Sequence, residues 1–328
     1  METLVYNFHS VLTNSLFPKN YPLSGFLHHQ VRIRSSRDLN IRRTWKMALS
    51  SSTHDAQNPA IQQQKIIILN KHGEKLVGVL HETRSMEIVI LCHGFRSSKE
   101  NNTMVNLAVA LENEGISSFR FDFSGNGESD GSFQYGNYWG EAGDLHDVIQ
   151  HFLGVNRIIG AVLGHSKGGN VVLLYASKYN DVHTIVNVSG RYNLEKGIEE
   201  RLGKEFLHRI EENGFIEVMN KTGQVNYHVT KESLMDRLNT NMHEECLKIG
   251  KKCRVLTVHG SADETIPVAD AFEFAKIIPN HTLHIIEGAD HGYTSHQAEL
   301  ASVVLNFIKA DQHEDNETPS LAPGGTNA

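Results

Sequence analysis

Residues 158–169 read IIGAVLGHSKGG, and this stretch decides the fold that the rest of the sequence predicts. The apolar and small residues at 158–163 are typical of a buried strand, and Gly164-His165-Ser166-Lys167-Gly168 follows at once. A G-x-S-x-G sequence between a strand and a helix predicts a tight turn that projects the serine hydroxyl from the sheet edge. The amino terminus of the helix expected at 169–178 also favours negative charge that develops there. Ser166 is therefore predicted to be a nucleophile rather than part of a purely structural turn.

Strand and helix patterns alternate on both sides of this stretch. Residues 66–69 and 76–80 read as a hairpin that turns at Gly73. The other elements expected are strands at 86–91, 116–121, 158–163, 182–188, 255–258 and 282–286, and helices at 102–114, 138–152, 169–178, 268–277 and 297–309. This alternation predicts an α/β fold with a mainly parallel sheet and helices on both faces.

One segment, residues 191–250, interrupts the alternation. It contains a stripe of apolar residues at every fourth position, then a hairpin pattern at 215–230, and then a short helical pattern at 234–238. Loops at the carboxyl ends of parallel strands are where ligands bind in such folds. The insert is therefore expected to be a cap over a pocket, and plain structural decoration is the alternative.

A nucleophilic serine needs a base and an acid that orients the base, in the chain order Ser, Asp or Glu, then His. Asp263 lies in the loop after the strand at 255–258, and His291 lies in the loop after the strand at 282–286. His291 is expected to take the proton of Ser166 and deliver it to the leaving group. Asp263 is expected to fix the tautomer of His291 and to stabilise the imidazolium.

Rival side chains lie in the same two loops. Glu264 is adjacent to Asp263, and Asp290 directly precedes His291, which places it badly to reach the far nitrogen of that ring. Twenty histidines make a lone histidine weak support for catalysis. His165 and His259 are interpreted as residues that pack the loops.

Two backbone amides are expected to form an oxyanion hole, one after the nucleophile and one from an early loop between a strand and a helix. These amides belong to Lys167 and Phe95, so the side chains need not take part. Asp122 and Gly125 are expected to shape a turn after their strand. No dinucleotide or phosphate-binding loop is complete, because Asp130 occupies the position of the third glycine in G-x-G-x-x-G.

Taken together, the ordered motifs resemble the α/β-hydrolase superfamily over about residues 60–310. The motifs are His93-Gly94-Phe95, Asp122-Phe123-Ser124-Gly125-Asn126-Gly127-Glu128-Ser129, Gly164-His165-Ser166-Lys167-Gly168, His259-Gly260-Ser261-Ala262-Asp263 and Asp290-His291. Within the superfamily the chain is similar to the esterase, lipase and thioesterase group, also called serine-aminopeptidase-like. That group includes cinnamoyl (feruloyl) esterases and largely uncharacterised plant relatives.

This resemblance implies the triad Ser166, Asp263 and His291, the oxyanion amides of Phe95 and Lys167, and a cap inserted before the strand that bears the acid. Cinnamoyl esterases carry a short cap that helps to bind the phenolic acid. Lys167 departs from their pattern, since they usually have Gln there. The backbone amide of residue 167 is the same with either residue, so the difference affects only contacts of its side chain with the substrate.

Composition and charge exclude several other classes of protein. The chain has 328 residues, 39% hydrophobic residues and 27 glycines, which is typical of a globular protein. No apolar run is long enough to span a membrane. Outside residues 1–54 the net charge is −12, which argues against a nucleic-acid partner. Cys92, Cys246 and Cys253 show no CxxC spacing, so neither a disulfide framework nor a metal site is indicated, and no cofactor is expected.

The two ends are expected to lie outside the hydrolase domain at 60–310. Residues 1–54 carry seven basic and two acidic side chains and many serines, as do transit peptides of plastids or mitochondria, and a disordered basic tail is the alternative. Translation from Met47 would instead give a cytoplasmic form with the same body. Residues 311–328 are expected to be disordered.

The sequence therefore predicts a serine hydrolase that cleaves a carboxylic ester of a small to medium apolar or aromatic acyl group through an acyl-enzyme on Ser166. Two alternatives remain open. One is a thioesterase, acyltransferase or peptidase with the same triad, and the other is a receptor-like protein that binds a small ligand without turnover. The sequence does not determine the oligomeric state.

Overall fold

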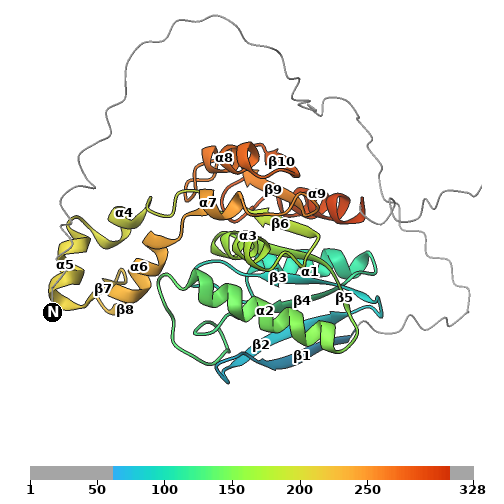
Figure 1. Cartoon of the computed structure of the whole chain (residues 1–328), viewed down its shortest axis with the longest axis horizontal. Helices are drawn as coiled ribbons and strands as arrows, with labels where there is room; N and C mark the ends of the chain where they lie inside the picture. The colour runs from blue at the N-terminus through green and yellow to red at the C-terminus, as the bar shows by residue number, and fades with distance from the viewer. Residues whose placement is uncertain (1–61, 311–328) are drawn as a thin grey trace, which may run out of the picture. The chain divides into compact units, whose positions relative to one another are not determined.

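The computed structural model of the protein describes residues 62–310 (Figure 1). The transit peptide expected at residues 1–54, the alternative start at Met47 and the disordered tail expected at residues 311–328 lie outside the described residues. No helix within residues 62–310 is long and apolar enough to cross a bilayer.

An eight-stranded sheet forms the centre of the described residues, with the strand order β1-β2-β4-β3-β5-β6-β9-β10 (Figure 1). Its strands are β1 (Gln62–Leu69), β2 (Lys75–Glu82), β3 (Glu87–Cys92), β4 (Ser117–Phe121), β5 (Ile158–His165), β6 (Thr184–Val188), β9 (Arg254–Gly260) and β10 (His281–Ile286). β2 pairs antiparallel with β1 and β4, and every other pairing is parallel. The carboxyl ends of the six parallel strands therefore lie along one edge of the sheet.

The hairpin at the edge of the sheet turns where the sequence predicts. Leu69 of β1 pairs with Lys75 of β2, and Gly73 in the turn between them has a φ of +79°. The side chain of Asn70 accepts hydrogen bonds from the amides of His72 and Glu74. Glycine suits this left-handed backbone, and the asparagine supports the turn from inside.

Two helical layers cover the sheet, one on each face, as expected for an α/β fold. One layer consists of α1 (Asn102–Asn113) and α9 (Gln297–Lys309), and the other consists of α2 (Tyr138–Gly154), α3 (Lys167–Tyr179), α7 (Met242–Cys246) and α8 (Ala269–Ile277). Successive residues of β3 alternate between the two hydrophobic cores, with Ile88 and Ile90 in one and Val89 and Leu91 in the other. This continuous apolar run is typical of a strand that is buried on both faces.

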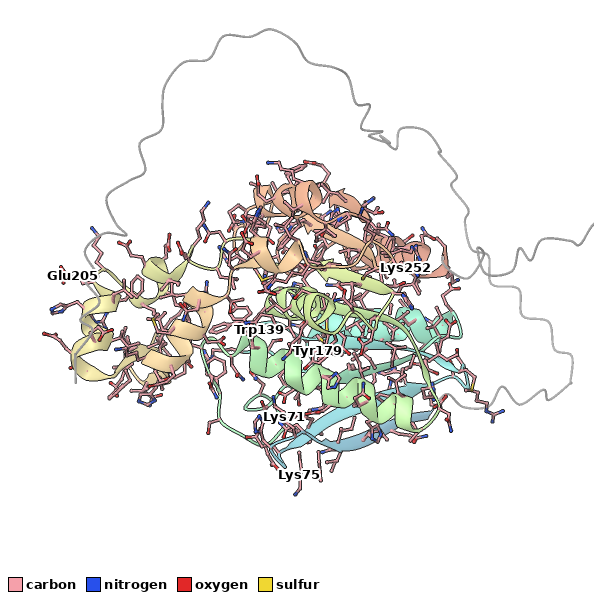
Figure 2. The ribbon with its side chains drawn as sticks, in the orientation of Figure 1. Lys71, Lys75, Trp139, Tyr179, Glu205 and Lys252 are labelled. Atoms are coloured by element: carbon pink, nitrogen blue, oxygen red, sulfur yellow. The ribbon has the colours of Figure 1, made fainter. Side chains whose placement is uncertain are left out.

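Aromatic side chains close the α2–α3 layer at its outer surface. Trp139 from α2 and Tyr179 from the end of α3 are partly buried against this core (Figure 2). The ammonium of Lys178 lies 5.7 Å from the ring centroid of Trp139 and 5.1 Å from that of Tyr179. These contacts fix α3 against α2, and α3 is the helix that begins directly after Ser166.

The insert between β6 and β9 builds a small core of its own. It contains α4 (Ile198–Leu202), α5 (Phe206–Asn213), the antiparallel pair β7 (Phe215–Met219) and β8 (Val225–Thr230), and α6 (Lys231–Asn239). Ile198, Leu202, Ile210, Val229 and Leu234 pack together with Tyr135 in a cluster separate from the two main cores. The elements α4 to α6 are called the cap below.

The cap differs in two details from the pattern expected at 191–250. The apolar stripe is split between α4 and α5, because Gly203 (φ +83°) and Glu205 (φ +58°) adopt left-handed backbone that ends one helix before the next begins. Met242 and Cys246 of α7 pack into the main core beneath α3 rather than into the core of the cap. The independent part of the insert therefore ends before Met242.

Candidate active site

Ser166 alone forms the turn between β5 and α3. Its φ of 57° and ψ of −120° are unusual for a residue with a side chain, and its amide donates to the carbonyl of Val188 at 2.8 Å. A Cβ added to Gly164 would lie 2.0 Å from the carbonyl oxygen of Gly168, and one added to Gly168 would lie 2.4 Å from that of Cys92. The flanking glycines are therefore required because three backbone segments meet around Ser166.

The structure brings Ser166, His291 and Asp263 together, although they lie on three separate loops. His291 Nε2 lies 3.0 Å from Ser166 Oγ, and His291 Nδ1 lies 2.7 Å from Asp263 Oδ2. The other carboxylate oxygen of Asp263 accepts the amides of Thr265 and Ile266, each at 2.8 Å. A serine hydroxyl, an imidazole and a carboxylate therefore lie within hydrogen-bond reach of one another in the order expected of a nucleophile, a base and an orienting acid.

Asp263 is held as a carboxylate. Burial acts to raise its pKa, but hydrogen bonds from His259, His291 and the Ile266 amide outweigh burial and hold the pKa well below its usual range. An ionised acid accepts a hydrogen bond from the Nδ1–H of His291, which leaves Nε2 of the same ring as an acceptor for the Ser166 hydroxyl. Because the Asp263 side chain is completely buried, water does not compete for this contact.

The rival acids lie apart from the histidine nitrogens. Glu264 is exposed, and no hydrogen bond joins it to His291 among the described residues. Asp290 is also exposed, and its Oδ1 accepts the Thr294 amide at 2.7 Å. The Thr294 hydrogen bonds lower the pKa of Asp290, so its role is to hold the loop that carries His291.

His165 and His259 pack the loops around the site. His165 Nε2 donates to the carbonyl of His291 at 2.8 Å, and burial, followed by the nearby His291 ring, lowers the pKa of His165 to about 4. His259 Nε2 donates to the carbonyl of Ile266 at 2.9 Å and lies 3.4 Å from Asp263 Oδ2. The two side chains therefore help to hold His291 and Asp263 in place.

The amides of Phe95 and Lys167 lie on the two segments that border Ser166. A Cβ added to Gly94 would lie 3.0 Å from Ser166 Cβ, so the loop after β3 packs directly against the serine. Lys167 is the first residue of α3, where helix geometry leaves amides without partners. Within residues 62–310, neither amide donates to another backbone group. Both are therefore available to an oxyanion at Ser166.

His93 fixes the loop that carries Phe95. Its Nδ1 donates to the carbonyl of Gly94 at 2.8 Å, and its Nε2 accepts the amide of Phe123 at 3.1 Å. Burial lowers the pKa of His93 to about 4, which keeps the ring neutral and able to make both contacts. A protonated ring has no acceptor and would lose the bond to Phe123.

Asp122 shapes a turn, as expected, rather than entering the site. Its carboxylate accepts the amide of Lys99 at 2.6 Å, the ammonium of Lys99 at 2.7 Å and the amide of Glu128 at 2.9 Å. Gly125 (φ +71°) and Gly127 (φ +52°) adopt left-handed backbone around it. A Cβ on Gly127 would lie 2.2 Å from Asp122 Oδ2, so glycine is needed for close approach.

A buried ion pair beside the nucleophile has no counterpart in the sequence prediction. Lys167 Nζ lies 2.6 Å from Glu141 Oε1 on α2, and both side chains are at most 5% exposed. The ammonium also lies 5.0 Å from the ring centroid of Tyr138. Burial raises the pKa of Glu141 to about 7, although Lys167 opposes this. The sequence predicts only a helix at residues 138–152 and does not single out Glu141, because the partner of Glu141 is distant in sequence.

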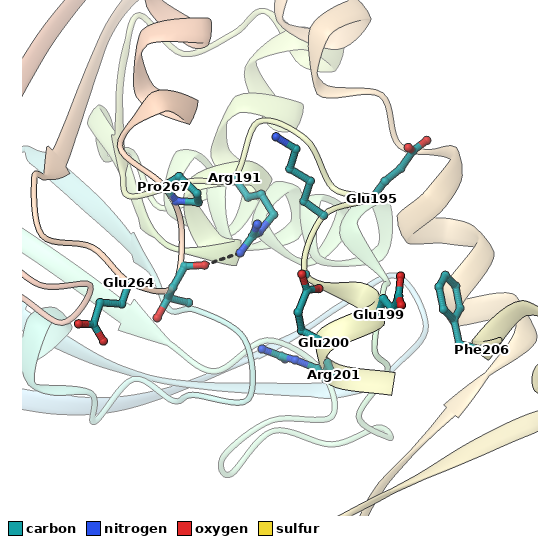
Figure 3. Close-up of a pocket in the computed structure, with 11 residues that line it drawn as sticks. Arg191, Glu195, Glu199, Glu200, Arg201, Phe206, Glu264 and Pro267 are labelled. Atoms are coloured by element: carbon teal, nitrogen blue, oxygen red, sulfur yellow. Dashed lines mark hydrogen bonds between the residues drawn. The ribbon is translucent and has the colours of Figure 1, made fainter. Parts of the chain in front are cut away.

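Two adjoining cavities are lined by residues of the main domain and of the insert. The inner cavity, about 60 Å³, is bordered by Ser166 and by residues of the main domain and the cap: Phe95, Tyr138, Lys167, Asn170, Arg191, Gly197, Arg201, Arg237, Thr265 and Ile266. The outer cavity, about 840 Å³, shares Arg191, Gly197, Arg201 and Thr265 with it (Figure 3). The two cavities are therefore neighbours, and only the inner one borders Ser166.

Sequence comparison places the chain in a known family. The profile described as serine aminopeptidase, S33, matches residues 83–297, which include Ser166, Asp263 and His291. A sequence relative, the uncharacterized protein YDL057W of Saccharomyces cerevisiae, is 25% identical over 243 residues, which are 68% of this chain and 72% of the yeast protein.

Solved structures share the fold. Est1E from Butyrivibrio proteoclasticus with ferulic acid bound has a TM-score of 0.66 at 23% identity, covering 76% of this chain and 100% of Est1E. The α/β hydrolase GrgF from Penicillium sp. sh18 has a TM-score of 0.65 at 18% identity, covering 76% of this chain and 98% of GrgF. The Pyrococcus furiosus esterase Pf2001 has a TM-score of 0.59 at 22% identity, covering 76% of this chain and 93% of Pf2001.

These structures match at low identity and establish the fold, whereas the family profile covers well over half of the chain and establishes the family. The resemblance inferred from the ordered motifs is thereby confirmed. The chain belongs to the serine aminopeptidase S33 family of the α/β-hydrolases.

Proposed function

We propose that the protein is a serine hydrolase that cleaves a carboxylic ester through an acyl-enzyme on Ser166. The observation that carries the proposal is the pair of hydrogen bonds of His291, one to Ser166 Oγ at 3.0 Å and one to Asp263 Oδ2 at 2.7 Å. A serine within reach of a neutral histidine that is oriented by a carboxylate is the arrangement that activates a hydroxyl for attack on a carbonyl carbon.

In the first half of the proposed reaction, Ser166 Oγ attacks the ester carbonyl while His291 Nε2 accepts the hydroxyl proton. The carbonyl oxygen becomes an oxyanion and receives hydrogen bonds from the amides of Phe95 and Lys167. Asp263 stabilises the imidazolium, which then gives its proton to the departing alkoxide. The products of this half are a free alcohol and an acyl group bonded to Ser166 Oγ.

In the second half, His291 takes a proton from water, and the resulting hydroxide attacks the acyl carbonyl in the same oxyanion hole. When the bond to Ser166 Oγ breaks, the proton returns from His291 to the serine. One oxyanion forms in each half of the reaction. Each backbone amide that donates to it typically stabilises the transition state by about 3 kcal/mol.

The inner cavity supports a small acyl group, or the end of a larger one, at Ser166. Phe95, Tyr138 and Ile266 provide apolar contacts around it. At about 60 Å³ the inner cavity is smaller than an aromatic acid, so a larger substrate would extend into the outer cavity of about 840 Å³. The ferulic acid bound to Est1E supports an aromatic acyl group as one candidate.

Steady-state turnover of acyl esters by the full chain tests this proposal. We expect hydrolysis of 4-nitrophenyl acetate and butyrate or of methyl ferulate, with kcat lowered roughly 10⁴-fold or more in Ser166→Ala. Ser132→Ala is the matched control, because Ser132 is exposed and its hydroxyl makes no hydrogen bond among the described residues.

Two results would redirect the assignment. Turnover of thioesters or amino-acid anilides in the absence of ester turnover would move the reaction to another class with the same triad. Tight stoichiometric binding of these compounds without turnover by the folded wild type would contradict the hydrolase and favour a ligand-binding protein.

A further inference from the structure

The inner cavity beside Ser166 is lined by four cationic side chains and by no carboxylate. They are Lys167, Arg191, Arg201 and Arg237. They come from separate parts of the chain, since Arg191 follows β6 while Arg201 and Arg237 belong to α4 and α6 of the cap. The ion pair with Glu141 accounts for the charge of Lys167. The three arginines therefore give the cavity its net positive charge.

No carboxylate within residues 62–310 forms an ion pair with any of these three arginines. Arg237, which is 7% exposed, donates from Nε to the carbonyl of Leu194 at 2.8 Å and from Nη2 to that of Lys196 at 3.0 Å. Arg191 donates from Nη2 to the carbonyl of Thr265 at 2.5 Å (Figure 3). These bonds orient the guanidinium groups without an ion pair, and the carboxylate of Asp270 acts on Arg191 from beyond ion-pair distance.

Arg201 contacts two aromatic side chains, Phe95 and Tyr227, and forms a side-chain hydrogen bond with Tyr227. Its guanidinium carbon lies 4.5 Å from the ring centroid of Phe95, the residue whose amide borders Ser166. Burial, and then the neighbouring Arg237, lower the pKa of Arg191, which is the expected effect of one cation on another. Grouping three like charges in a partly buried site is unfavourable unless an anion completes it.

The lining of the outer cavity is far less positive than that of the inner one, because Lys196 and the two shared arginines face glutamates there. Four glutamates, Glu195, Glu199, Glu200 and Glu264, line the outer cavity, and none of them lines the inner one. Arg191 and Arg201 line both cavities, and Figure 3 draws them among the residues of the outer one. An anionic group would therefore be disfavoured among the glutamates and favoured farther in, beside Ser166.

We propose that the substrate of this hydrolase is an ester that also carries a carboxylate, and that Arg191, Arg201 and Arg237 bind this carboxylate next to Ser166. This inference rests on the proposed function and names its substrate class. A guanidinium presents paired N–H donors whose geometry matches a carboxylate, and three of them converge on one cavity. The remainder of the acyl or alcohol part can still be apolar or aromatic.

Two pairs of esters, each matched in shape, test the proposal on the full chain. Monomethyl glutarate and methyl glutaramate differ only by a carboxylate or an amide on the acyl side. The acetyl ester of 4-hydroxybenzoate and that of 4-hydroxybenzamide differ in the same way on the leaving-group side. We expect kcat/KM to be at least tenfold higher for the anionic member of one pair, and that pair identifies the side that the arginines bind.

Arg201→Gln is the variant of choice, because Arg191 and Arg237 also donate to the backbone carbonyls of Thr265, Leu194 and Lys196, which their loss would leave without these donors. We expect the anionic-to-neutral ratio of kcat/KM to fall about tenfold in Arg201→Gln, and to fall in wild type when salt is raised to molar concentration. Lys204→Gln is the matched control, since Lys204 is an exposed cation three residues away that lines neither cavity. Its ratio should stay within twofold of wild type.

Equal kcat/KM within both pairs, or a preference for both amides, would overturn the proposal while leaving the hydrolase intact. Binding of the same four esters to Ser166→Ala, measured by calorimetry, keeps the inference testable if no ester is turned over. Tighter binding of an anionic member, weakened by Arg201→Gln, would support the arginine site even if the hydrolase proposal failed. Equal binding within both pairs would refute the arginine site.

Discussion

Asp263 uses both of its carboxylate oxygens, and Oδ2 is directed at His291 Nδ1 from 2.7 Å. Oδ1 is held by two backbone amides of its own loop. The carboxylate therefore has little freedom to turn away from the histidine. Its orientation follows from the chain that surrounds it, and the tautomer of His291 follows from that orientation.

Asp263→Asn should lower kcat roughly 10⁴-fold for any ester that the wild type hydrolyses. The asparagine side chain has the same shape, but its NH₂ group would donate to Nδ1 of His291 and so stabilise the tautomer that carries its proton on Nε2. Asp290→Asn is the control, since Asp290 contacts the Thr294 amide and not the histidine. Steady-state kinetics on both variants distinguish the two acids. A large loss in Asp290→Asn with little loss in Asp263→Asn would reverse their roles.

Glu141→Gln should lower the free energy of unfolding by about 3–5 kcal/mol, because it leaves the buried ammonium of Lys167 without an opposite charge. Lys167→Gln should cost a similar amount by leaving Glu141 unpaired. The double variant should lose much less than the sum of the two. Urea unfolding of the four proteins completes the cycle, and additive losses would show that the pair does not act as a unit.

Gly164→Ala and Gly168→Ala should each lower the free energy of unfolding by several kcal/mol, because a Cβ at either position overlaps backbone within 2.4 Å. Gly154→Ala at the end of α2 has open space around its Cβ, and we expect it to be neutral or to stabilise by up to about 1 kcal/mol. Thermal melting ranks the three variants. Wild-type stability of Gly164→Ala would contradict the close packing of the turn.

His165 should make the fold sensitive to acid. Its pKa of about 4 in the folded protein lies below the value of 6.5 for an ordinary histidine, so the unfolded chain takes up a proton first as the pH falls. Above pH 6.5 the titration of His165 does not change the free energy of unfolding. As the pH falls from 6.5 to 4, proton uptake by the unfolded chain lowers that free energy. The loss amounts to about 3 kcal/mol over that interval.

The difference in unfolding free energy between wild type and His165→Gln isolates this effect. Glu141 acts in the opposite direction, since its pKa of about 7 lies above the ordinary 4.5 and favours the folded state as the pH falls between these values. Both proteins retain Glu141, so its contribution cancels in the difference. A difference that stays constant between pH 7 and pH 4 would contradict burial of a neutral His165.

The sequence was sufficient to predict the elements that depend on local pattern and chain order. The strand before Ser166, the helix after it, and the loops that carry Asp263 and His291 follow from apolar runs and from the order of residues. The structure moves the start of that helix from the expected residue 169 to Lys167, so that Ser166 is the whole turn. Helix ends are set by backbone geometry that a hydrophobic pattern does not contain.

The charged groups around the nucleophile were not predictable in the same way. Glu141 meets Lys167 only because α2 packs on α3, and Arg201 and Arg237 reach Ser166 only because the cap folds over the sheet edge. In the sequence these arginines look like solvent-exposed residues within amphipathic segments. Their convergence results from tertiary packing between segments that are far apart in the chain.

Labelling with a fluorophosphonate probe tests the central claim most directly, because the probe reacts with an activated serine whatever its natural substrate. We predict one phosphonyl adduct on the folded full chain, located by peptide mass spectrometry at Ser166 and absent in Ser166→Ala. Asp263→Asn should slow the labelling, whereas Ser132→Ala should label at the wild-type rate. Folded wild type that stays unlabelled, or an adduct on another serine, would contradict the assignment of Ser166 as the nucleophile.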